Sequence, residues 1–190
     1  MTAEERSLLQ LLDRTLRSEQ IRAQILPIVE RIRSELTRKR DVLMAWEPIP
    51  LTLFDGPLPD MIRSSWVFIL RAGVNTGAER HPNSHQRMMS FGGIGDMQTE
   101  AESADRSARA PFNIAWQSHV LVSDPEAPLE RRWISIPQNV WHRPVIPKGS
   151  DWVVVSFHTV PAEELIEERP PNSDAGAMKR MLYLAPDRKG

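Results

Sequence analysis

The chain has 190 residues, which is enough for one domain with its own core and short for two. Its 24 Lys and Arg residues balance 25 Asp and Glu residues, so no bulk charge favours nucleic acid or an anionic membrane. Cysteine is absent, which excludes disulfides, thiolate nucleophiles, Cys-ligated zinc and iron–sulfur clusters.

Residues 1–41 predict a pair of amphipathic helices. Thr2, followed three residues later by Glu5, is a candidate capping box. One apolar stripe runs at helical spacing through residues 8–16, and a second runs through residues 21–36. Pro27 interrupts the second stripe, so that helix is either kinked at Pro27 or restarts there. Both stripes must pack on the rest of the domain or on another subunit.

Residues 42–168 predict a β domain made of many short strands. Each expected strand is rich in Val, Ile, Trp or Phe and is bounded by Pro, Gly, Asp or Asn. The expected strands are 42–46, 51–54, 65–71, 86–91, 96–99, 113–122, 132–136 and 151–159. Such spacing is typical of an all-β sandwich or barrel.

The connecting segments predict turns and irregular structure. Residues 92–96 are glycine-rich and predict a turn, and residues 99–111 predict an exposed loop. Residues 169–190 predict an irregular C-terminal tail, of which 178–184 could pack back on the domain. The N-terminus is charged and does not resemble a signal peptide, and no apolar run approaches the roughly 20 residues of a membrane span. We therefore expect a cytoplasmic protein that binds neither membrane nor nucleic acid.

Three of the five histidines lie in two short segments, residues 79–85 and 137–142. Residues two apart on a strand face the same way, so Glu79 and His81 would share a face. His85 would then begin the neighbouring strand, and His142 would come from a third. Three imidazoles and one carboxylate suit Fe, Mn, Ni, Zn or Cu and leave positions open for water, substrate or dioxygen. The predicted metal ligands are therefore Glu79, His81, His85 and His142.

The first segment resembles the first motif of the cupin superfamily. That motif has His-x-His, then Glu four residues after the second His, then Gly seven residues further on. Glu79-x-His81, His85 and Gly92 reproduce this spacing with the Glu and one His exchanged.

The second segment is similar to the second cupin motif, Pro-x-Gly-x-x-His. Pro137, Asn139 and His142 match it with Asn in place of Gly, a replacement that suits a residue with positive φ. Ile146 stands where the motif usually has Asn, and Arg131 stands where it usually begins with Gly. The resemblance covers roughly residues 65–159.

What the resemblance implies is an all-β fold: a single antiparallel jelly-roll (cupin) β-barrel, here preceded by two N-terminal α-helices. It also implies a metal in the mouth of the barrel and a tendency to form homodimers. Cupins include dioxygenases, isomerases, decarboxylases, lyases and non-catalytic binders, so the fold alone does not name the chemistry.

The leading functional hypothesis is a metal-dependent enzyme on a small-molecule substrate. More specifically, it is a non-haem iron dioxygenase that cleaves an aromatic or dicarbonyl compound, with Fe(II) as the expected ion and Mn, Ni, Zn or Cu as compatible ones. The alternatives are a cupin lyase or isomerase, or a non-catalytic sensor or structural cupin that binds a metal or ligand.

Two further residues are candidates for catalytic roles. From His85 the strand alternation carries Arg87 to the same face, so Glu79 either binds the metal or pairs with a buried Arg87. If Glu79 binds the metal, Arg87 is free to hold a substrate carboxylate or enolate, and the substrate is anionic. His119 is either an inward-facing proton shuttle or an outward-facing strand residue, and His158 is expected to be structural.

Overall fold

The computed structural model describes residues 1–54, 56, 58–101, 114–171 and 177–184. Three α-helices are present in this part of the chain: α1 (Ala3–Arg17), α2 (Glu19–Arg38) and the short α3 (Leu129–Arg132). Two single-turn 3₁₀ helices, η1 (Leu51–Leu53) and η2 (Ala162–Glu164), lie in connections. The strands are β1 (Met44–Ile49), β2 (Ser64–Leu70), β3 (Gln86–Gly92), β4 (Ile94–Glu100), β5 (Trp116–Gln117), β6 (Val120–Val122), β7 (Trp133–Ile136), β8 (His142–Val145), β9 (Trp152–His158), β10 (Ile166–Arg169) and β11 (Lys179–Leu182).

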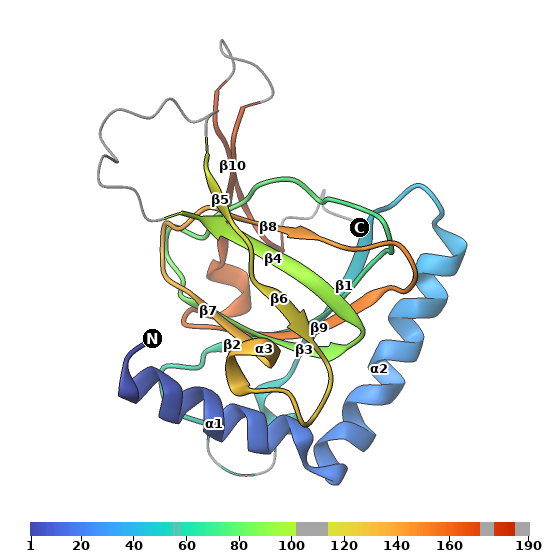
Figure 1. Ribbon diagram of the computed structural model, residues 1–190, viewed down its shortest axis with the longest axis vertical. Coiled ribbons are helices and arrows are strands. Elements are labelled where there is room, and N and C mark those ends of the chain that lie inside the picture. The colour runs from blue at the N-terminus through green and yellow to red at the C-terminus, as the bar shows by residue number, and fades with distance from the viewer. Residues whose placement is uncertain (55, 57, 102–113, 172–176, 185–190) are drawn as a thin grey trace.

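The strands form antiparallel sheets (Figure 1). A five-stranded sheet has the order β1-β2-β9-β3-β7. A four-stranded sheet is built around β4, which pairs with β5, β6 and β8, and β10 and β11 form a hairpin of their own. The prediction of antiparallel β structure behind two N-terminal helices is confirmed. The described strands form separate sheets rather than one closed barrel, so the jelly-roll barrel stays a prediction.

The five-stranded sheet is buried on both faces. On β2, for example, Val67 and Ile69 belong to the core under the helices, whereas Trp66 and Phe68 belong to the core between the two sheets. Successive side chains of a strand face opposite ways, so alternate positions supply the two cores. An apolar run without polar alternation is the expected sequence of such a strand.

Helices α1 and α2 cover the outer face of the five-stranded sheet (Figure 1). Thr2 caps α1 as expected, since its hydroxyl accepts a hydrogen bond of 3.2 Å from the Glu5 amide. The Glu5 carboxylate does not complete a capping box and instead reaches Arg87 of β3. α2 continues through Pro27, so of the two alternatives a restart at Pro27 is wrong. The two apolar stripes pack on the chain's own sheet.

The remaining differences from the predicted elements have local causes. Residues 51–54 contain the 3₁₀ helix η1 in place of a strand, and residues 113–122 hold two short strands, β5 and β6, with residue 113 outside the described part. β8 was not predicted because its Pro144 lacks a backbone donor and argues against a strand. The predicted loop 99–111 begins within β4, and its residues 102–111 lie outside the described part of the chain.

Glycines set the geometry where the two sheets approach each other. Gly93, with φ 83°, forms the predicted turn between β3 and β4. A Cβ on Gly95 of β4 would lie 2.1 Å from the ring of Trp152 on β9. Glycine is therefore required at position 95 for the sheets to pack at this distance.

Candidate metal centre

The backbone places Glu79 directly opposite His142. Their amides and carbonyls exchange two hydrogen bonds of 2.9 and 2.8 Å in an isolated antiparallel bridge. Two residues that are paired in this way carry their side chains on the same face. Nearby, the Asn139 amide donates to the His81 carbonyl at 3.1 Å, so residues 79–81 lie beside residues 139–142.

Asn139 makes the turn that leads into β8. Its φ is 62°, a left-handed conformation that Asn tolerates better than other non-glycine residues. This confirms the expectation that Asn replaces Gly where the chain needs a positive φ. The turn carries the chain from β7 back towards the site and delivers His142 opposite Glu79.

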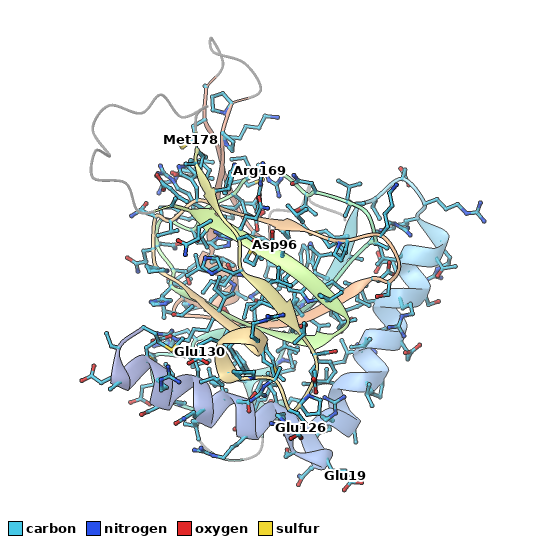
Figure 2. All side chains as sticks on the ribbon, in the orientation of Figure 1. Glu19, Asp96, Glu126, Glu130, Arg169 and Met178 are labelled. Carbon is cyan, nitrogen blue, oxygen red and sulfur yellow. The ribbon has the colours of Figure 1, made fainter. Side chains whose placement is uncertain are left out.

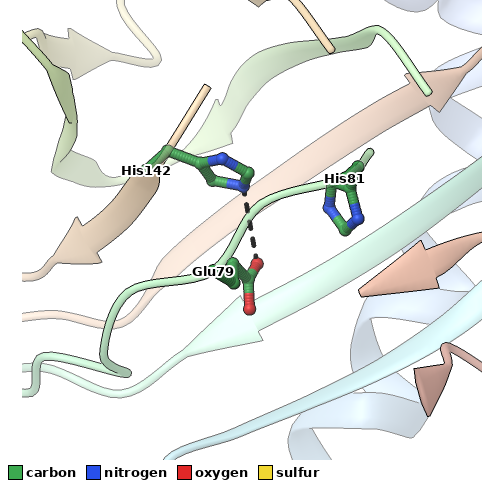
Figure 3. A group of neighbouring side chains, drawn as sticks. All are labelled: Glu79, His81 and His142. Carbon is green, nitrogen blue, oxygen red and sulfur yellow. Dashed lines mark ion pairs between the residues drawn. The ribbon is translucent and has the colours of Figure 1, made fainter. Parts of the chain in front are cut away.

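Glu79, His81 and His142 converge on one point inside the protein (Figure 3). Their possible ligand atoms lie within 4.8 Å of one another. Oε1 of Glu79 lies 3.6 Å from Nε2 of His142. Two atoms bound to one ion at about 2.1 Å each lie roughly 3 to 4 Å apart, so this separation fits shared coordination. Both imidazoles are buried, and the Glu79 side chain is 12% exposed.

Hydrogen bonds set the orientation of both imidazoles. Nδ1 of His81 donates to the Ile166 carbonyl at 2.9 Å, and Nδ1 of His142 donates to the Val140 carbonyl at 3.1 Å. In a neutral imidazole with its proton on Nδ1, the lone pair lies on Nε2. Metal-binding histidines are usually held in this way.

Nε2 of His142 is buried and makes no hydrogen bond within the described part of the chain. Buried nitrogen atoms without a partner are rare in folded proteins, because leaving them unsatisfied costs about 1–3 kcal/mol. A cation held by this lone pair, by Glu79 and by His81 would remove that cost. The donor set of two nitrogen atoms and one oxygen atom therefore fits a divalent metal ion.

Arg169 of β10 holds the other side of the Glu79 carboxylate. Its Nη2 donates to Oε2 of Glu79 at 2.8 Å, and its Nε donates to Oε1 of Glu167 at 2.6 Å. Burial works to raise the pKa of the Glu79 carboxyl, but its neighbouring side chains, among them the cationic Arg169, outweigh this and hold that pKa well below its usual range. Glu79 is therefore ionised, with Oε2 on the arginine and Oε1 towards His142.

A small cavity opens beside this group. It has a volume of about 30 Å³, room for roughly two water molecules. Its polar lining consists of Glu79, His81, Gln86, His158 and Tyr183. Its apolar lining comes from both sheets and consists of Met44, Phe68, Leu70, Met88, Met97, Pro144 and Val154.

His158 of β9 lies in this cavity wall, with its ring centroid 5.1 Å from that of His81. Its Nδ1 lies 3.2 Å from the Ser84 hydroxyl, and its Nε2 lies 3.4 Å from that of Ser156. Burial lowers the pKa of His158 well below its ordinary value, so the ring is neutral. The side chain that was expected to be only structural thus faces the candidate metal centre.

His85 does not join the other predicted ligands. Its Nε2 lies 2.6 Å from the Ser135 hydroxyl and 3.9 Å from Glu5 of α1. Burial and the nearby Arg87 lower the pKa of His85. The prediction that His85 shares a metal site with Glu79, His81 and His142 is not supported by this placement.

Arg87 also lies away from the cavity. Its Nε and Nη2 donate to the two oxygen atoms of Glu5 at 2.7 and 2.8 Å, a bidentate ion pair that joins β3 to α1. The alternative pairing of Arg87 with Glu79 is therefore wrong, because Glu79 pairs with Arg169. An Arg87 engaged in this way is not placed to hold a substrate carboxylate.

His119 lies between β5 and β6, half-buried at the side of the four-stranded sheet. Its Nε2 lies 2.9 Å from the Thr99 hydroxyl, and its amide donates to Asp96 at 2.8 Å. Burial lowers the pKa of His119, which favours the neutral ring. His119 does not line the cavity, so the proton-shuttle role stays a prediction without support from this geometry.

One physical fact accounts for the misplacement of His85 and Arg87. Both were assigned correctly to one face of β3, but that face packs under α1, and the cavity lies on the other face with Gln86. Both faces of β3 are buried, so apolar alternation does not show which face lines the cavity. If the wrong face is assumed, every side chain of the strand is placed on the wrong side. The period-two pattern that put Arg87 with His85 also puts Gln86 with Met88 in the cavity wall.

Arg169 and Tyr183 were missed because they lie in the predicted irregular tail, residues 169–190. Tyr183 is buried, lines the cavity and packs against Trp46 and Trp66, with ring centroids 5.1 and 5.2 Å away. Arg169 lies at the end of the molecule that carries the β10–β11 hairpin, far from Glu130 and the start of α1 (Figure 2). The packing of residues 178–184 on the domain that the sequence allows is confirmed at Tyr183.

Comparisons with solved structures find distant similarities, among them an oxalate oxidase, CapF and cocosin. No family model and no curated protein matches the sequence. An oxalate oxidase is 14% identical with a TM-score of 0.45, over 62% of this chain and 51% of the other. CapF, bound to 3-isopropenyl-tropolone, is 13% identical with a TM-score of 0.46, over 65% of this chain and 30% of the other. The coconut allergen cocosin is 17% identical with a TM-score of 0.41, over 57% and 24% of the two chains.

The chain thus spans about half of these proteins or less. All three TM-scores lie below 0.5, so these similarities do not assign the chain to a family. Within the described residues, no helix is long and apolar enough to cross a bilayer.

Proposed function

We propose that this chain is a metal-dependent enzyme of the cupin type that acts on a small molecule. Three features support the proposal: the two motif-like segments, the facing antiparallel sheets, and the convergence of Glu79, His81 and His142 between them. The motif-like segments and the facing sheets favour a cupin fold, and the convergence of the three side chains favours metal chemistry.

The observation that carries the proposal is the composition of the site. Two buried imidazoles and one ionised carboxylate form the donor set that non-haem Fe(II) oxygenases use, with further positions left open for substrate and dioxygen. We therefore favour Fe(II) and a dioxygenase reaction, with Mn, Ni, Zn and Cu as compatible ions. When bound, such an ion would supply the redox chemistry that no described side chain provides.

The chain's own residues would orient the ligands and exclude water. The Ile166 and Val140 carbonyls fix the two imidazoles, and Arg169 fixes the carboxylate. The cavity volume of about 30 Å³ is far below the roughly 150 Å³ that accommodates benzene. A small dicarbonyl compound therefore suits the cavity better than an aromatic ring does.

A second candidate function, a non-catalytic binding protein, is favoured by the ion pair between Arg169 and Glu79. At 2.8 Å this pair satisfies one carboxylate oxygen without any metal. A cupin lyase or isomerase would use similar ligands and is a third possibility for the same site.

Metal analysis tests the site first. Protein supplied with Fe(II), Mn, Ni or Zn is expected to retain about one equivalent, and His142→Ala and Glu79→Gln are expected to lose at least tenfold in metal affinity. His119→Ala is the matched control, because it removes a histidine outside the group. Retention far below one equivalent in the wild type, or equal losses in all three variants, would contradict the metal centre.

Oxygen uptake then tests the reaction. The iron-loaded protein is assayed against a panel of small diketones and hydroxylated aromatic compounds, and the diketones are expected to stimulate uptake. Metal retained without turnover of any panel member would favour the binding protein, the lyase or the isomerase over the dioxygenase.

A further inference from the structure

Gln86 is a buried polar residue of the cavity wall that the metal centre does not use. It begins β3, is 6% exposed, and lies opposite His158 of β9 in the strand register. It lines the same cavity as Glu79, His81 and His158. Its side chain thus contributes to the wall of the space beside the candidate metal centre.

The amide oxygen of Gln86 makes no hydrogen bond to any residue in the described part of the chain. Buried acceptors are nearly always satisfied by protein or water, so this atom points to a donor that the protein itself does not supply. An amide oxygen accepts hydrogen bonds and cannot donate one. The missing group must therefore carry an O–H or N–H.

The cavity restricts what that group can be. Its volume of about 30 Å³ leaves space for an ion and one further small group. A hydroxyl next to a divalent ion is a strong donor, because the ion withdraws electron density from its oxygen. A hydroxyl on a small molecule bound at the metal satisfies both the space and the unused acceptor.

We propose that Gln86 determines substrate specificity by accepting a hydrogen bond from a hydroxyl of the bound molecule. The site would therefore select hydroxylated small molecules, such as hydroxy acids or the enol form of a dicarbonyl compound. This inference rests on the proposed metal centre and narrows its substrate class. Gln86 touches the ligand and holds it in place, and no bond is made or broken at its amide.

The test compares lactate with propionate, which differ only by the α-hydroxyl, on protein loaded with Co(II). The visible spectrum of Co(II) reports both uptake of the ion and binding of either acid. Wild-type protein is expected to prefer lactate. In Gln86→Met that preference is expected to fall by about tenfold, the typical effect of one lost hydrogen bond. Gln117→Met, which makes the same substitution at an exposed glutamine of β5 that does not line the cavity, is the control and is expected to keep the preference within about twofold.

A stability measurement separates this role from a structural one. If Gln86 serves a ligand, Gln86→Met removes an unsatisfied acceptor and the melting temperature of ligand-free protein is expected to stay level or rise. A clear fall in melting temperature would show that the amide stabilises the fold and would overturn the inference. An unchanged lactate preference in Gln86→Met would overturn it as well.

Failure of the metal centre has a different signature. If wild-type protein takes up no Co(II), the proposed function fails, and calorimetry of lactate and propionate with the metal-free protein decides the role of Gln86. A lactate preference that depends on Gln86 would support the role, and its absence would overturn it. A loss of Co(II) affinity in Gln86→Met of more than tenfold would make Gln86 a metal ligand and would also overturn it.

Discussion

Single residues in the site hold conformations or charges that their neighbours must stabilise. Asn139 adopts a positive φ, and Arg169 compensates two carboxylates that lie away from solvent. Each of the two residues hydrogen-bonds to a candidate ligand, Asn139 to His81 and Arg169 to Glu79, and neither would bind an ion itself. Substituting either residue therefore measures how much it contributes to the free energy of unfolding while all three candidate ligands are kept.

Asn139→Val is expected to destabilise the protein, because a β-branched residue in the left-handed region costs about 1–3 kcal/mol. Asn139→Gly removes that strain and is expected to stay within about 0.5 kcal/mol of wild type. Urea unfolding measures both variants. Equal stabilities for the Val and Gly variants would show that the turn does not need its positive φ.

Arg169→Met is expected to lower the free energy of unfolding of the metal-free protein by about 2–4 kcal/mol. It leaves Glu79 and the fully buried Glu167 without their shared cation, and the figure is reduced from the fully buried case because Arg169 is itself 26% exposed. Arg143→Met, whose guanidinium donates to the neutral Gln98, is the matched control and is expected to cost about 1 kcal/mol or less. Similar losses in the two variants would show that charge compensation at Arg169 contributes nothing specific.

At the scale of elements, strand β3 separates two polar clusters, because its neighbouring residues Gln86 and Arg87 face opposite ways. Arg87 faces α1 and binds Glu5, whereas Gln86 faces the cavity. Glu5 also accepts a hydrogen bond of 2.6 Å from Ser135 of β7, so one carboxylate ties the first turn of α1 to two strands. This cluster anchors the helix and does not belong to the candidate metal centre.

The Glu5 anchor predicts a pH dependence. Burial works to raise the pKa of Glu5, but the hydrogen bonds from Arg87 and Ser135 outweigh it, so the folded-state pKa lies below the unfolded value. The unfolded chain then binds a proton more readily, and the anchor's contribution is full above about pH 4.5 and is lost as pH falls through the folded pKa. Unfolding of wild type should therefore become easier as pH falls below about 4.5, with a steeper slope than in Glu5→Gln.

At neutral pH, Glu5→Gln is expected to cost about 1–3 kcal/mol through weakened hydrogen bonds to a charged partner. Glu4→Gln, at the exposed neighbouring position, should change stability by less than about 0.5 kcal/mol. If Glu5→Gln and wild type lose stability in parallel as the pH falls, the anchor does not operate through the Glu5 charge.

Sequence patterns predicted where helices and strands lie better than they predicted which face of a strand lines the cavity. Apolar periodicity located the two helices and most strands, and motif spacing brought Glu79, His81 and His142 together. The face of β3 was not predictable, because burial on both sides removes the polar alternation that separates core from solvent. Arg169 and His158 were not predictable as site residues, since their positions depend on pairings between segments that are distant in the chain.

At the scale of the whole molecule, the chain forms three layers: two helices, a five-stranded sheet and a four-stranded sheet (Figure 1). The core under the helices is mainly apolar, whereas the cavity and the three candidate ligands lie between the sheets. The helices bury most of their apolar stripes within the chain, and homodimer formation stays a prediction.

Tyr183 directly follows the β10–β11 hairpin, and its substitution tests whether this hairpin packs on the rest of the domain. Tyr183 is 2% exposed, packs on Trp46 and Trp66 and lines the cavity, although it follows a segment that was predicted to be irregular. Tyr183→Ala should therefore lower the free energy of unfolding by about 3–5 kcal/mol, as for a large aromatic residue removed from a core. Leu182→Ala, one residue earlier and 49% exposed, should cost less than about 0.5 kcal/mol. Urea unfolding of both variants decides the matter. Equal, small losses would mean that the hairpin is not docked, and a large loss confined to Tyr183 would make β10, β11 and Tyr183 a structural part of the cavity.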